Sequence, residues 1–353
     1  MTEKEIDQVL ERINSWPRLA FLHLPTPLEF LTNLTEIYKG PEIYVKRDDL
    51  TGRGFGGNKS RKLEFIIADA LKKGCDSLVT WGSYQSNWCF QLALASRRFN
   101  LKPILILFYP DKEPENEGNL LLNRLLEAEI YFSQVPAGKV VSRDFALDKI
   151  KEILPELTAR NLHPYIVSVG GSMPLGSMEI PLGAVSYLLA FYEAWRQAKN
   201  RGISFSYVIH ASGSGATQVG LLLGTKIFSP KTKVIGISVS DDKAYLAQEV
   251  KIIAEASIQA LSLKIVIEDE DIIILDDYLE GGYGIFSPKV TQVIKLLLQK
   301  EGLVLDPVYT AKAMIGLLDL IRRGFFEKND KILFFHTGGA PALFAYGSQI
   351  LSQ

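Results

Sequence analysis

The segment Gly56-Gly57-Asn58-Lys59-Ser60-Arg61-Lys62-Leu63-Glu64 is the most informative stretch of this chain. Asn58 is a suitable helix N-cap, apolar residues at helical spacing follow it, and Gly74 marks the stop. Lys59 and two further cations therefore stand in the first helical turn, where the helix dipole disfavours positive charge. Such a position favours a neutral amine, which is the form that a Schiff-base lysine needs. A solvated basic turn is the alternative, but the paired glycines and the upstream segment Lys46-Arg47-Asp48-Asp49 favour a functional lysine.

The composition is that of an ordinary globular protein. Of 353 residues, 47% are hydrophobic and 22% are charged, and the net charge is -1. The length favours two domains, or one large domain with an insertion. The near-zero charge argues against nucleic acid as the main partner.

Targeting and metal signals are missing from the sequence. The first residues are charged rather than apolar, and no run of about 18 apolar residues suggests a membrane span. The two cysteines make neither a disulfide framework nor a zinc pattern, and the four histidines form no spaced cluster with acids or cysteines. We therefore expect a cytoplasmic chain with no metal and no membrane contact.

Short apolar runs alternate with longer helical patterns, which predicts parallel βαβ units. The expected strands are residues 43–45, 77–81, 103–108, 129–132, 165–169, 207–210, 233–239 and 331–335. The expected helices are residues 60–73, 89–99, 118–128, 175–197, 217–227, 242–260, 288–300 and 310–322. In open sheets of this kind, ligands bind beyond the carboxyl ends of the strands. The turns that follow strands are therefore candidate sites.

Two further turns could hold anions. In Gly82-Ser83-Tyr84-Gln85-Ser86-Asn87, Ser86 or Asn87 can cap the next helix, and the amides at that helix end suit a carboxylate. The glycines and hydroxyls of Ser212-Gly213-Ser214-Gly215-Ala216-Thr217 suit a phosphate. The next glycine, Gly220, comes two residues too late for a dinucleotide fingerprint, which argues against a nicotinamide dehydrogenase. Turns without a ligand are the alternative at both places.

A fourth turn, His336-Thr337-Gly338-Gly339-Ala340, again permits close backbone approach. His336 could be a catalytic base. A lone histidine at a strand end is more often a hydrogen-bonded structural group, and we favour that interpretation.

Six motifs occur in order along the chain and together resemble one family. They are Pro25-Thr26-Pro27-Leu28-Glu29, Lys46-Arg47-Asp48-Asp49, the Gly56 to Glu64 segment, Gln85-Ser86-Asn87, Asp306-Pro307-Val308-Tyr309 and His336-Thr337-Gly338-Gly339. This set resembles the family of D-cysteine desulfhydrase and 1-aminocyclopropane-1-carboxylate (ACC) deaminase, which uses pyridoxal phosphate (PLP). The resemblance runs from about Pro25 to Tyr346.

The resemblance implies the tryptophan-synthase-β-like fold, which is fold type II of the PLP enzymes. That fold is α/β, with a large parallel-sheet PLP domain and a smaller inserted α/β domain. We expect the large domain at residues 1–65 and 178–353, and the smaller one at residues 66–177. A homodimer is also expected from the family.

The resemblance further assigns roles to single residues. Lys59 would carry the cofactor, Asn87 would hydrogen-bond its 3-hydroxyl, and Ser86 with neighbouring amides would hold a substrate carboxylate. The implied cofactor contacts are Lys59, Asn58, Asn87, Gly213, Ser214, Gly215, Ala216, Thr217 and Thr310. The implied substrate contacts are Gln85, Ser86, Asn87 and Trp88. The implied catalytic residues are Lys59, Ser86, Tyr283 and Tyr309.

Two departures from the family bear on the reaction. Thr310 stands where ACC deaminases carry a glutamate that faces the pyridine nitrogen, and a hydroxyl cannot hold that nitrogen protonated as a carboxylate does. This favours D-cysteine desulfhydrase-like α,β-elimination from a small amino acid, giving a 2-oxo acid, ammonia and the leaving group. The second departure is Trp88-Cys89-Phe90, which makes this flank bulkier and less polar than in the family. The sequence therefore does not define which amino acid is the substrate. An ACC deaminase and a non-catalytic homologue that binds PLP or an amino acid are the alternatives.

Overall fold

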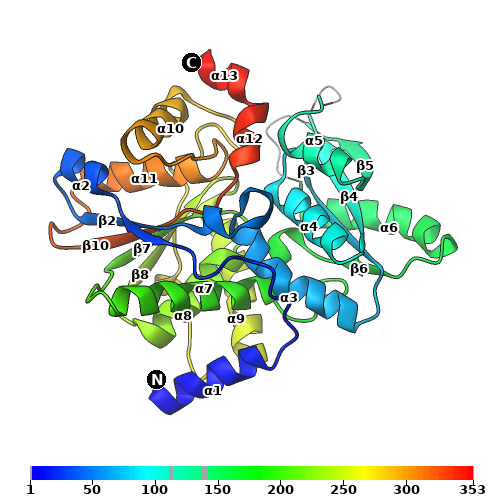
Figure 1. Ribbon diagram of the computed structural model, residues 1–353, viewed down its shortest axis with the longest axis horizontal. Helices are drawn as coiled ribbons and strands as arrows, with labels where there is room; N and C mark the ends of the chain where they lie inside the picture. The colour runs from blue at the N-terminus through cyan, green and yellow to red at the C-terminus, as the bar shows by residue number, and fades with distance from the viewer. Residues whose placement is uncertain (1, 111–113, 137–140, 353) are drawn as a thin grey trace.

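The computed structural model describes residues 2–110, 114–136 and 141–352. Two sheets lie side by side, and each is covered by helices on both faces (Figure 1). The larger sheet has six strands in the order β1-β2-β10-β7-β8-β9, and the smaller has four in the order β5-β4-β3-β6. The fold is therefore α/β with two sheets, as the sequence predicts.

Neighbouring strands are parallel throughout both sheets, except that β1 runs antiparallel to β2. The strands of the larger sheet are β1 (Leu28–Phe30), β2 (Glu42–Lys46), β7 (Tyr207–Ser212), β8 (Lys233–Ser238), β9 (Ile273–Leu275) and β10 (Lys331–Phe335). Those of the smaller sheet are β3 (Ser77–Ser83), β4 (Lys102–Tyr109), β5 (Glu129–Gln134) and β6 (Pro164–Ile166).

The smaller sheet is an insertion in the larger one. All four of its strands lie in the chain between β2 and β7, while β10 pairs with both β2 and β7 and so joins the two ends of the chain. This is the expected arrangement of a large parallel-sheet domain with a smaller inserted one. The exact domain boundaries, at residues 65/66 and 177/178, stay a prediction.

Most helices of the described chain connect one strand to the next, and the others lie at the two ends of the chain. They are α1 (Glu3–Asn14), α2 (Thr32–Tyr38), α3 (Asn58–Lys72), α4 (Asn87–Arg98), α5 (Gly118–Leu125), α6 (Arg143–Ala159), α7 (Leu182–Lys199), α8 (Ala216–Phe228), α9 (Lys243–Leu261), α10 (Pro288–Glu301), α11 (Thr310–Arg322), α12 (Ala340–Ala345) and α13 (Gly347–Leu351). None of the described helices has both the length and the apolar character of a membrane span.

Side-chain alternation along the buried strands produces two cores. In β10, Ile332 and Phe334 pack with α10 and α11, whereas Leu333 and Phe335 pack with α7 and α8. Figure 1 shows these helix pairs above and below the larger sheet. Because successive side chains of a strand point to opposite faces, both faces of a parallel strand need apolar residues. This explains why these strands read as continuous apolar runs.

The structure differs from the sequence expectations in several elements. The helix expected over residues 175–197 begins only at Leu182, because Pro181 disfavours a helical conformation in the residue before it. The strand expected over residues 165–169 is shorter, and residues 169–171 form a 3₁₀ turn. Helix α6 was not expected, since it contains Pro155 and buries few side chains.

Candidate active site

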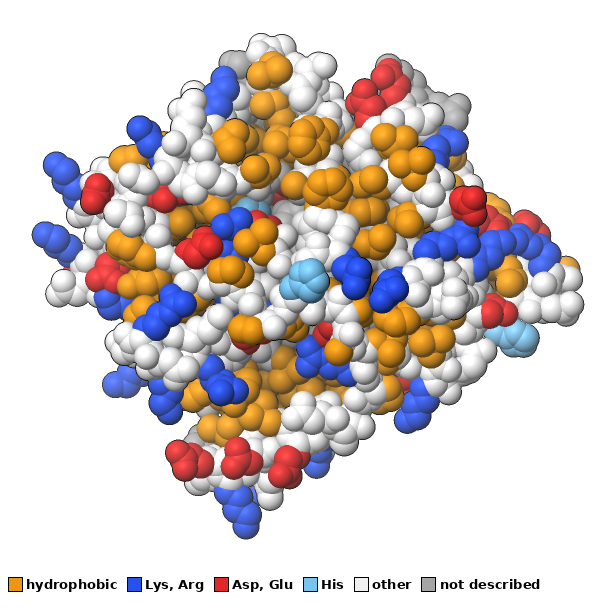
Figure 2. Space-filling model, in the orientation of Figure 1, with side chains coloured by type: hydrophobic (Ala, Val, Ile, Leu, Met, Phe, Trp, Pro, Cys, Tyr) orange, Lys and Arg blue, Asp and Glu red, His pale blue; other side chains and the backbone are white. Residues whose placement is uncertain are grey.

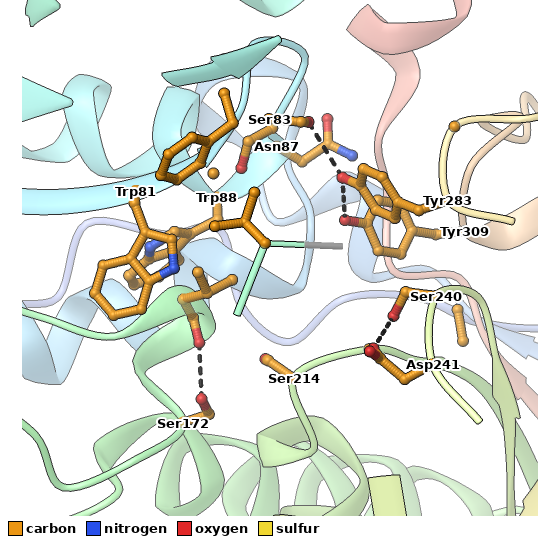
Figure 3. Close-up of a pocket in the computed structure, with 18 of the residues that line it drawn as sticks. Trp81, Ser83, Asn87, Trp88, Ser172, Ser214, Ser240, Asp241, Tyr283 and Tyr309 are labelled. Atoms are coloured by element: carbon orange, nitrogen blue, oxygen red, sulfur yellow. Dashed lines mark hydrogen bonds between the residues drawn. The ribbon is translucent and has the colours of Figure 1, made fainter. Parts of the chain in front are cut away.

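A cavity of about 510 Å³ lies where the carboxyl ends of the two sheets face each other. Figure 3 shows Trp81 and Trp88 on one side of it and Tyr283 and Tyr309 on the other. The predicted site residues that line it are Asn58, Lys59, Ser86, Asn87, Trp88, Gly213, Ser214, Gly215, Thr217, Tyr283 and Tyr309. Segments from both sheets thus converge on one place.

Helix α3 begins differently from the sequence expectation. Its N-cap is Gly57 rather than Asn58, and Gly57 has a φ of +118°. A β-carbon on Gly57 would lie 3.1 Å from the carbonyl oxygen of Thr337, so the glycine allows this close approach. Asn58 does not cap, because its Nδ2 donates to Thr217 Oγ1 (3.2 Å) and its Oδ1 accepts from Lys59 Nζ (3.2 Å). The Asn58 side chain therefore ties the start of α3 to the start of α8.

Lys59 points into the cavity and is easily deprotonated. Burial lowers the pKa of its ammonium to about 8, although the nearby Asp306 carboxylate opposes this shift. Its Nζ also lies 5.8 Å from the centre of the Tyr309 ring. A reactive amine is thus present as expected. The main cause is loss of water rather than the helix dipole that the sequence suggested.

The start of helix α8 offers backbone amides to the cavity. Its N-cap is Gly215, with a φ of +81° and no side chain to occupy the first amides. Ser214 and Thr217 place hydroxyl groups beside it. Unpaired amides at a helix N-terminus, together with the helix dipole, attract anions.

Lys62 is a second buried lysine of α3 to which the sequence analysis assigned no role. Its Nζ is fully buried and has no hydrogen-bond partner among the described residues. A β-carbon built on Gly170 would lie 2.5 Å from Ser214 Oγ and 3.7 Å from Lys62 Nζ, so this amine stands beside the α8 turn. Burial holds the pKa of Lys62 well below its usual value. Its place three residues after Lys59, on the same helical face, was the available signal.

The turn before helix α4 is also ordered by hydrogen bonds. Of the two expected candidates, Ser86 is the N-cap, and its Oγ accepts from Cys89 N at 3.2 Å. Asn119 Nδ2 donates to Asn87 Oδ1 at 2.7 Å, which leaves Asn87 Nδ2 as a donor on the cavity side. Trp88 is buried, and its Nε1 donates to Thr80 Oγ1 at 2.7 Å.

Comparison with known proteins decides the family. The family described as pyridoxal-phosphate dependent enzyme matches residues 19–338. This chain belongs to that family.

Relatives of this PLP enzyme match over nearly its whole length. A protein of Pyrococcus abyssi (strain GE5 / Orsay), provisionally named 1-aminocyclopropane-1-carboxylate deaminase, is 37% identical over 98% of both chains. A D-cysteine desulfhydrase of Serratia proteamaculans (strain 568) is 38% identical over 96% of this chain and 99% of its own. PLP is therefore the cofactor of this enzyme, and the resemblance found in the sequence is confirmed.

Solved structures confirm fold type II. The crystal structure of an ACC deaminase homologue superposes with a TM-score of 0.87, at 33% identity, over 100% of this chain and 99% of that one. Threonine deaminase isoform 2 from Solanum lycopersicum gives a TM-score of 0.64 at 18% identity, over 100% of this chain and 89% of its own, which shows the fold alone.

The residues of the cavity fit PLP. Lys59 offers an amine of lowered pKa, as an aldehyde carbon requires. The open end of α8 and the unpartnered Lys62 Nζ offer donors for a phosphate dianion. Among the described residues, no group of acids, cysteines or histidines is arranged to hold a metal ion.

The two predicted tyrosines form one hydrogen-bonded unit in this PLP enzyme. Tyr283 Oη and Tyr309 Oη lie 2.9 Å apart, and Tyr283 Oη lies 3.3 Å from Ser83 Oγ at the end of β3 (Figure 3). Burial raises the pKa of both phenols, so both keep their protons at neutral pH. The unit therefore links the larger sheet's side of the cavity to the smaller sheet.

Three predicted site residues do not line the cavity. Gln85 turns away, where its Oε1 accepts from Asn119 N (2.8 Å). Ala216 is buried, and its amide donates to Ser214 O (3.1 Å). Thr310 Oγ1 donates to the buried carboxylate of Asp306 at 2.7 Å. A cofactor contact by Thr310 and Ala216, and a substrate contact by Gln85, stay predictions.

His336 has the structural role that we favoured. It is buried, its Nδ1 accepts from Gly338 N (3.2 Å), and its Nε2 lies 3.1 Å from the carbonyl oxygen of Val304. Burial lowers the pKa of the imidazole, so the ring is neutral. It fixes the glycine turn against which α3 begins.

Proposed function

We propose that this PLP enzyme catalyses α,β-elimination from a small amino acid, in the manner of a D-cysteine desulfhydrase. The products are a 2-oxo acid, ammonia and the leaving group. The observation that carries the proposal is the meeting of Lys59 with the Tyr283–Tyr309 pair in one cavity. An amine can take up the α-proton there, and a phenol can donate a proton to the departing group.

Binding and proton transfer divide between the two sides of the cavity. Ser86 and the first amides of α4 would hold the substrate carboxylate, as a helix N-terminus does for an anion. The α8 turn, Lys62 and Asn87 would hold the cofactor by its phosphate and 3-hydroxyl. When bound, PLP supplies the electron sink that stabilises negative charge at the substrate α-carbon.

Lys59 Nζ would hold the cofactor before the substrate arrives and then move the α-proton. With a pKa near 8, a freed amine is partly neutral at neutral pH and can accept that proton. The carbon–sulfur bond at the β-carbon then breaks, with the electron pair leaving on sulfur. The Tyr283–Tyr309 unit would protonate the thiolate, and water would hydrolyse the remaining unsaturated amine to the 2-oxo acid and ammonia.

The deciding experiment is a panel of D- and L-amino acids with detection of 2-oxo acid and sulfide. D-Cysteine is expected to give both products in equal amounts. Retention of PLP with no turnover of any member would instead mean a non-catalytic homologue.

ACC deaminase is the second candidate, because the Pyrococcus protein and the solved homologue carry that name. Against it, Thr310 is a hydroxyl that already donates to Asp306. Release of 2-oxobutyrate from ACC at a rate above that of pyruvate from D-cysteine would reverse this preference.

We also propose a homodimer. Helices α5 and α12 pack together and expose large apolar side chains, with Leu125 and Phe344 each 71% exposed. Figure 2 shows hydrophobic side chains gathered over these two helices. Such patches are typical of subunit contacts. Light scattering should give twice the chain mass, and the double variant Leu125→Lys and Phe344→Lys should give the mass of one chain.

A cytoplasmic location is proposed as well, supported by the two free thiols.

A further inference from the structure

The carboxyl edge of the smaller sheet is apolar where it meets the cavity. Its four strands are parallel, so their carboxyl ends lie along one edge. The apolar cavity-lining residues at these four ends are Trp81 in β3, Phe108 in β4, Val135 after β5 and Val169 after β6. Ser83 at the end of β3 and Ser168 after β6 also line the cavity. Ligand groups that reach this edge therefore meet apolar surface from every strand.

This apolar wall is held in place by the small-domain core. Trp81 and Phe108 are only 5% and 3% exposed, and they pack in the cluster under α6. Trp88 closes the wall on the α4 side, and its indole N–H is already used by Thr80 Oγ1. Thr80 Oγ1 in turn donates to Val167 O at 2.8 Å. Trp81, Trp88 and Phe108 thus present ring surface to the cavity.

The serines beside the wall are satisfied by their own loop. Ser168 Oγ donates to Met173 O (3.1 Å), and Ser172 Oγ donates to Val169 O (2.8 Å). Figure 3 shows the Ser172 bond next to the cavity. A polar or charged substrate group placed here would lose water without gaining a partner. An apolar group loses nothing, and Met173 can adapt to its shape.

The opposite wall disfavours a negatively charged substituent. Ser240 and Asp241 face the cavity there, and Asp241 accepts a hydrogen bond from Ser240 (Figure 3). Arg143 of α6, which also lines the cavity, is paired with Glu249 of α9. Arg143 is therefore already neutralised, and Asp241 offers no positive charge to a second carboxylate on the substrate.

The cavity has to hold the cofactor as well as the substrate. Its volume, about 510 Å³, is in the range that binds whole drug-sized ligands. With the substrate carboxylate at Ser86 and its amine near Lys59, the β-substituent is the part free to extend along the wall.

We propose that the substrates are β-substituted alanines whose leaving group is a neutral, apolar thiol, as in S-benzylcysteine. The substituent lies against Trp81, Phe108 and Val169. This rests on the proposed α,β-elimination. The Cα–H and Cβ–S bonds break, the thiolate leaves with the electron pair and takes up a proton, and one water converts the remainder to pyruvate and ammonia.

The test compares three thioethers with cysteine, each in both configurations, on the holoenzyme. S-Benzylcysteine is expected to exceed cysteine in kcat/KM by at least about tenfold, since even one methylene in an apolar pocket is worth about tenfold or more. S-Propylcysteine should fall between them, and S-carboxymethylcysteine should be the poorest. Thiol and pyruvate release give turnover, and the shift of the cofactor's visible absorbance gives binding.

Matched variants test the wall itself. Val169→Asp should lower the ratio of kcat/KM for S-benzylcysteine over cysteine by at least about tenfold. Val169→Leu, which keeps the wall apolar, should hold that ratio within about threefold.

The outcomes separate the two proposals. If cysteine is turned over while S-benzylcysteine neither shifts the absorbance nor reacts, this inference is overturned and the elimination stands. If S-benzylcysteine binds more tightly than cysteine and S-carboxymethylcysteine but no compound yields pyruvate, the substrate class stands and the elimination fails. A preference for S-carboxymethylcysteine would also overturn the inference.

Discussion

The buried cations on the two faces of helix α3 differ in their partners. On the face toward α7, Arg61 binds both Asp48 (2.8 Å) and Glu193 (2.9 Å), and Lys46 donates to Glu193 (2.6 Å). Toward the cavity, Lys59 Nζ has only an amide oxygen at 3.2 Å. Beside it, near the α8 turn, Lys62 Nζ has no hydrogen-bond partner in the described chain and lies 5.6 Å from the centre of the Tyr187 ring. One helix thus carries a closed ion network and an open pair of amines.

The difference separates structure from function. A buried charge is tolerated when partners replace the water it loses, which is the state of Arg61. A buried amine without partners lowers stability, and such a group is typical of a site where a ligand supplies the missing partner. We infer that Arg61 stabilises the fold, whereas Lys59 and Lys62 serve PLP.

We call the face of α3 that carries Lys59 and Lys62 the open face, and the face that carries the Arg61 ion network the closed face. The largest effect is expected on the open face. Lys59→Ala removes the amine that carries the cofactor and moves the α-proton, so turnover should fall by at least about 10⁴-fold. The visible absorbance of lysine-bound PLP should vanish, while the midpoint of urea unfolding of the apo-protein should barely change. If Lys59→Ala kept the absorbance and roughly a tenth of the activity, another residue would have to carry the cofactor.

On the closed face the effect should be on stability. Arg61→Met removes the cation that Asp48 and Glu193 share and leaves only Lys46 beside Glu193, and such a loss costs about 3–5 kcal/mol of unfolding free energy. Equilibrium urea unfolding of the apo-protein measures it. Arg160→Met removes an ion pair at the surface and is the control, with an expected cost far below that of Arg61→Met. Equal costs for the two variants would refute the contrast.

Lys62→Met tests the open face without touching the reacting amine. It replaces an unpartnered buried amine by an apolar side chain of similar length, so the apo-protein should be as stable as before or more stable. Affinity for PLP should fall about 10- to 100-fold if the lysine meets the phosphate. Fluorescence titration with PLP, and with inorganic phosphate as a competitor, measures this. An unchanged affinity would leave Lys62 without a ligand role.

The sequence predicted the open face better than the closed one. Lys59 stands in a turn whose glycines and N-terminal position are visible in nine consecutive residues, and the carboxyl ends of the apolar strands predicted where ligands bind. The network needs Arg61 and Glu193, which lie 132 positions apart. Only the packing of α3 on α7 brings them together, so no local pattern could predict the pair.

The same limit applies within the site. The lysine at position 62 was visible, but its lack of a partner depends on the surrounding chain, including Gly170 from the inserted segment. Asn58 was expected to cap α3, yet a contact with Thr217 from a distant helix takes its side chain. Tertiary contacts of this kind override local preference.

The smallest effect is expected at another buried lysine, Lys312. Its partners are neutral, so it is neither ion-paired like Lys46 nor without hydrogen bonds like Lys62. Lys312 of α11 donates to the carbonyl oxygens of Leu279 (2.7 Å) and Gly282 (2.6 Å), and so holds the loop that presents Tyr283. Burial lowers the pKa of Lys312 to about 8. As pH rises through 8, the ammonium loses its charge and the hydrogen bonds weaken, which should loosen the tyrosine.

Lys312→Met should therefore lower kcat about tenfold with little change in KM for the substrate, because Tyr283 acts on the leaving group rather than on binding. Lys312→Arg keeps the positive charge at every accessible pH and should restore most of kcat. Loss of the Lys312 charge should make kcat fall above pH 8. Lys59 also titrates near pH 8, but its deprotonation acts in the opposite direction, because the neutral amine is the form that takes up the α-proton. Only the fall caused by Lys312 should move to higher pH in Lys312→Arg. Identical pH profiles for this variant and the natural enzyme would mean that Lys312 supports the fold without positioning Tyr283.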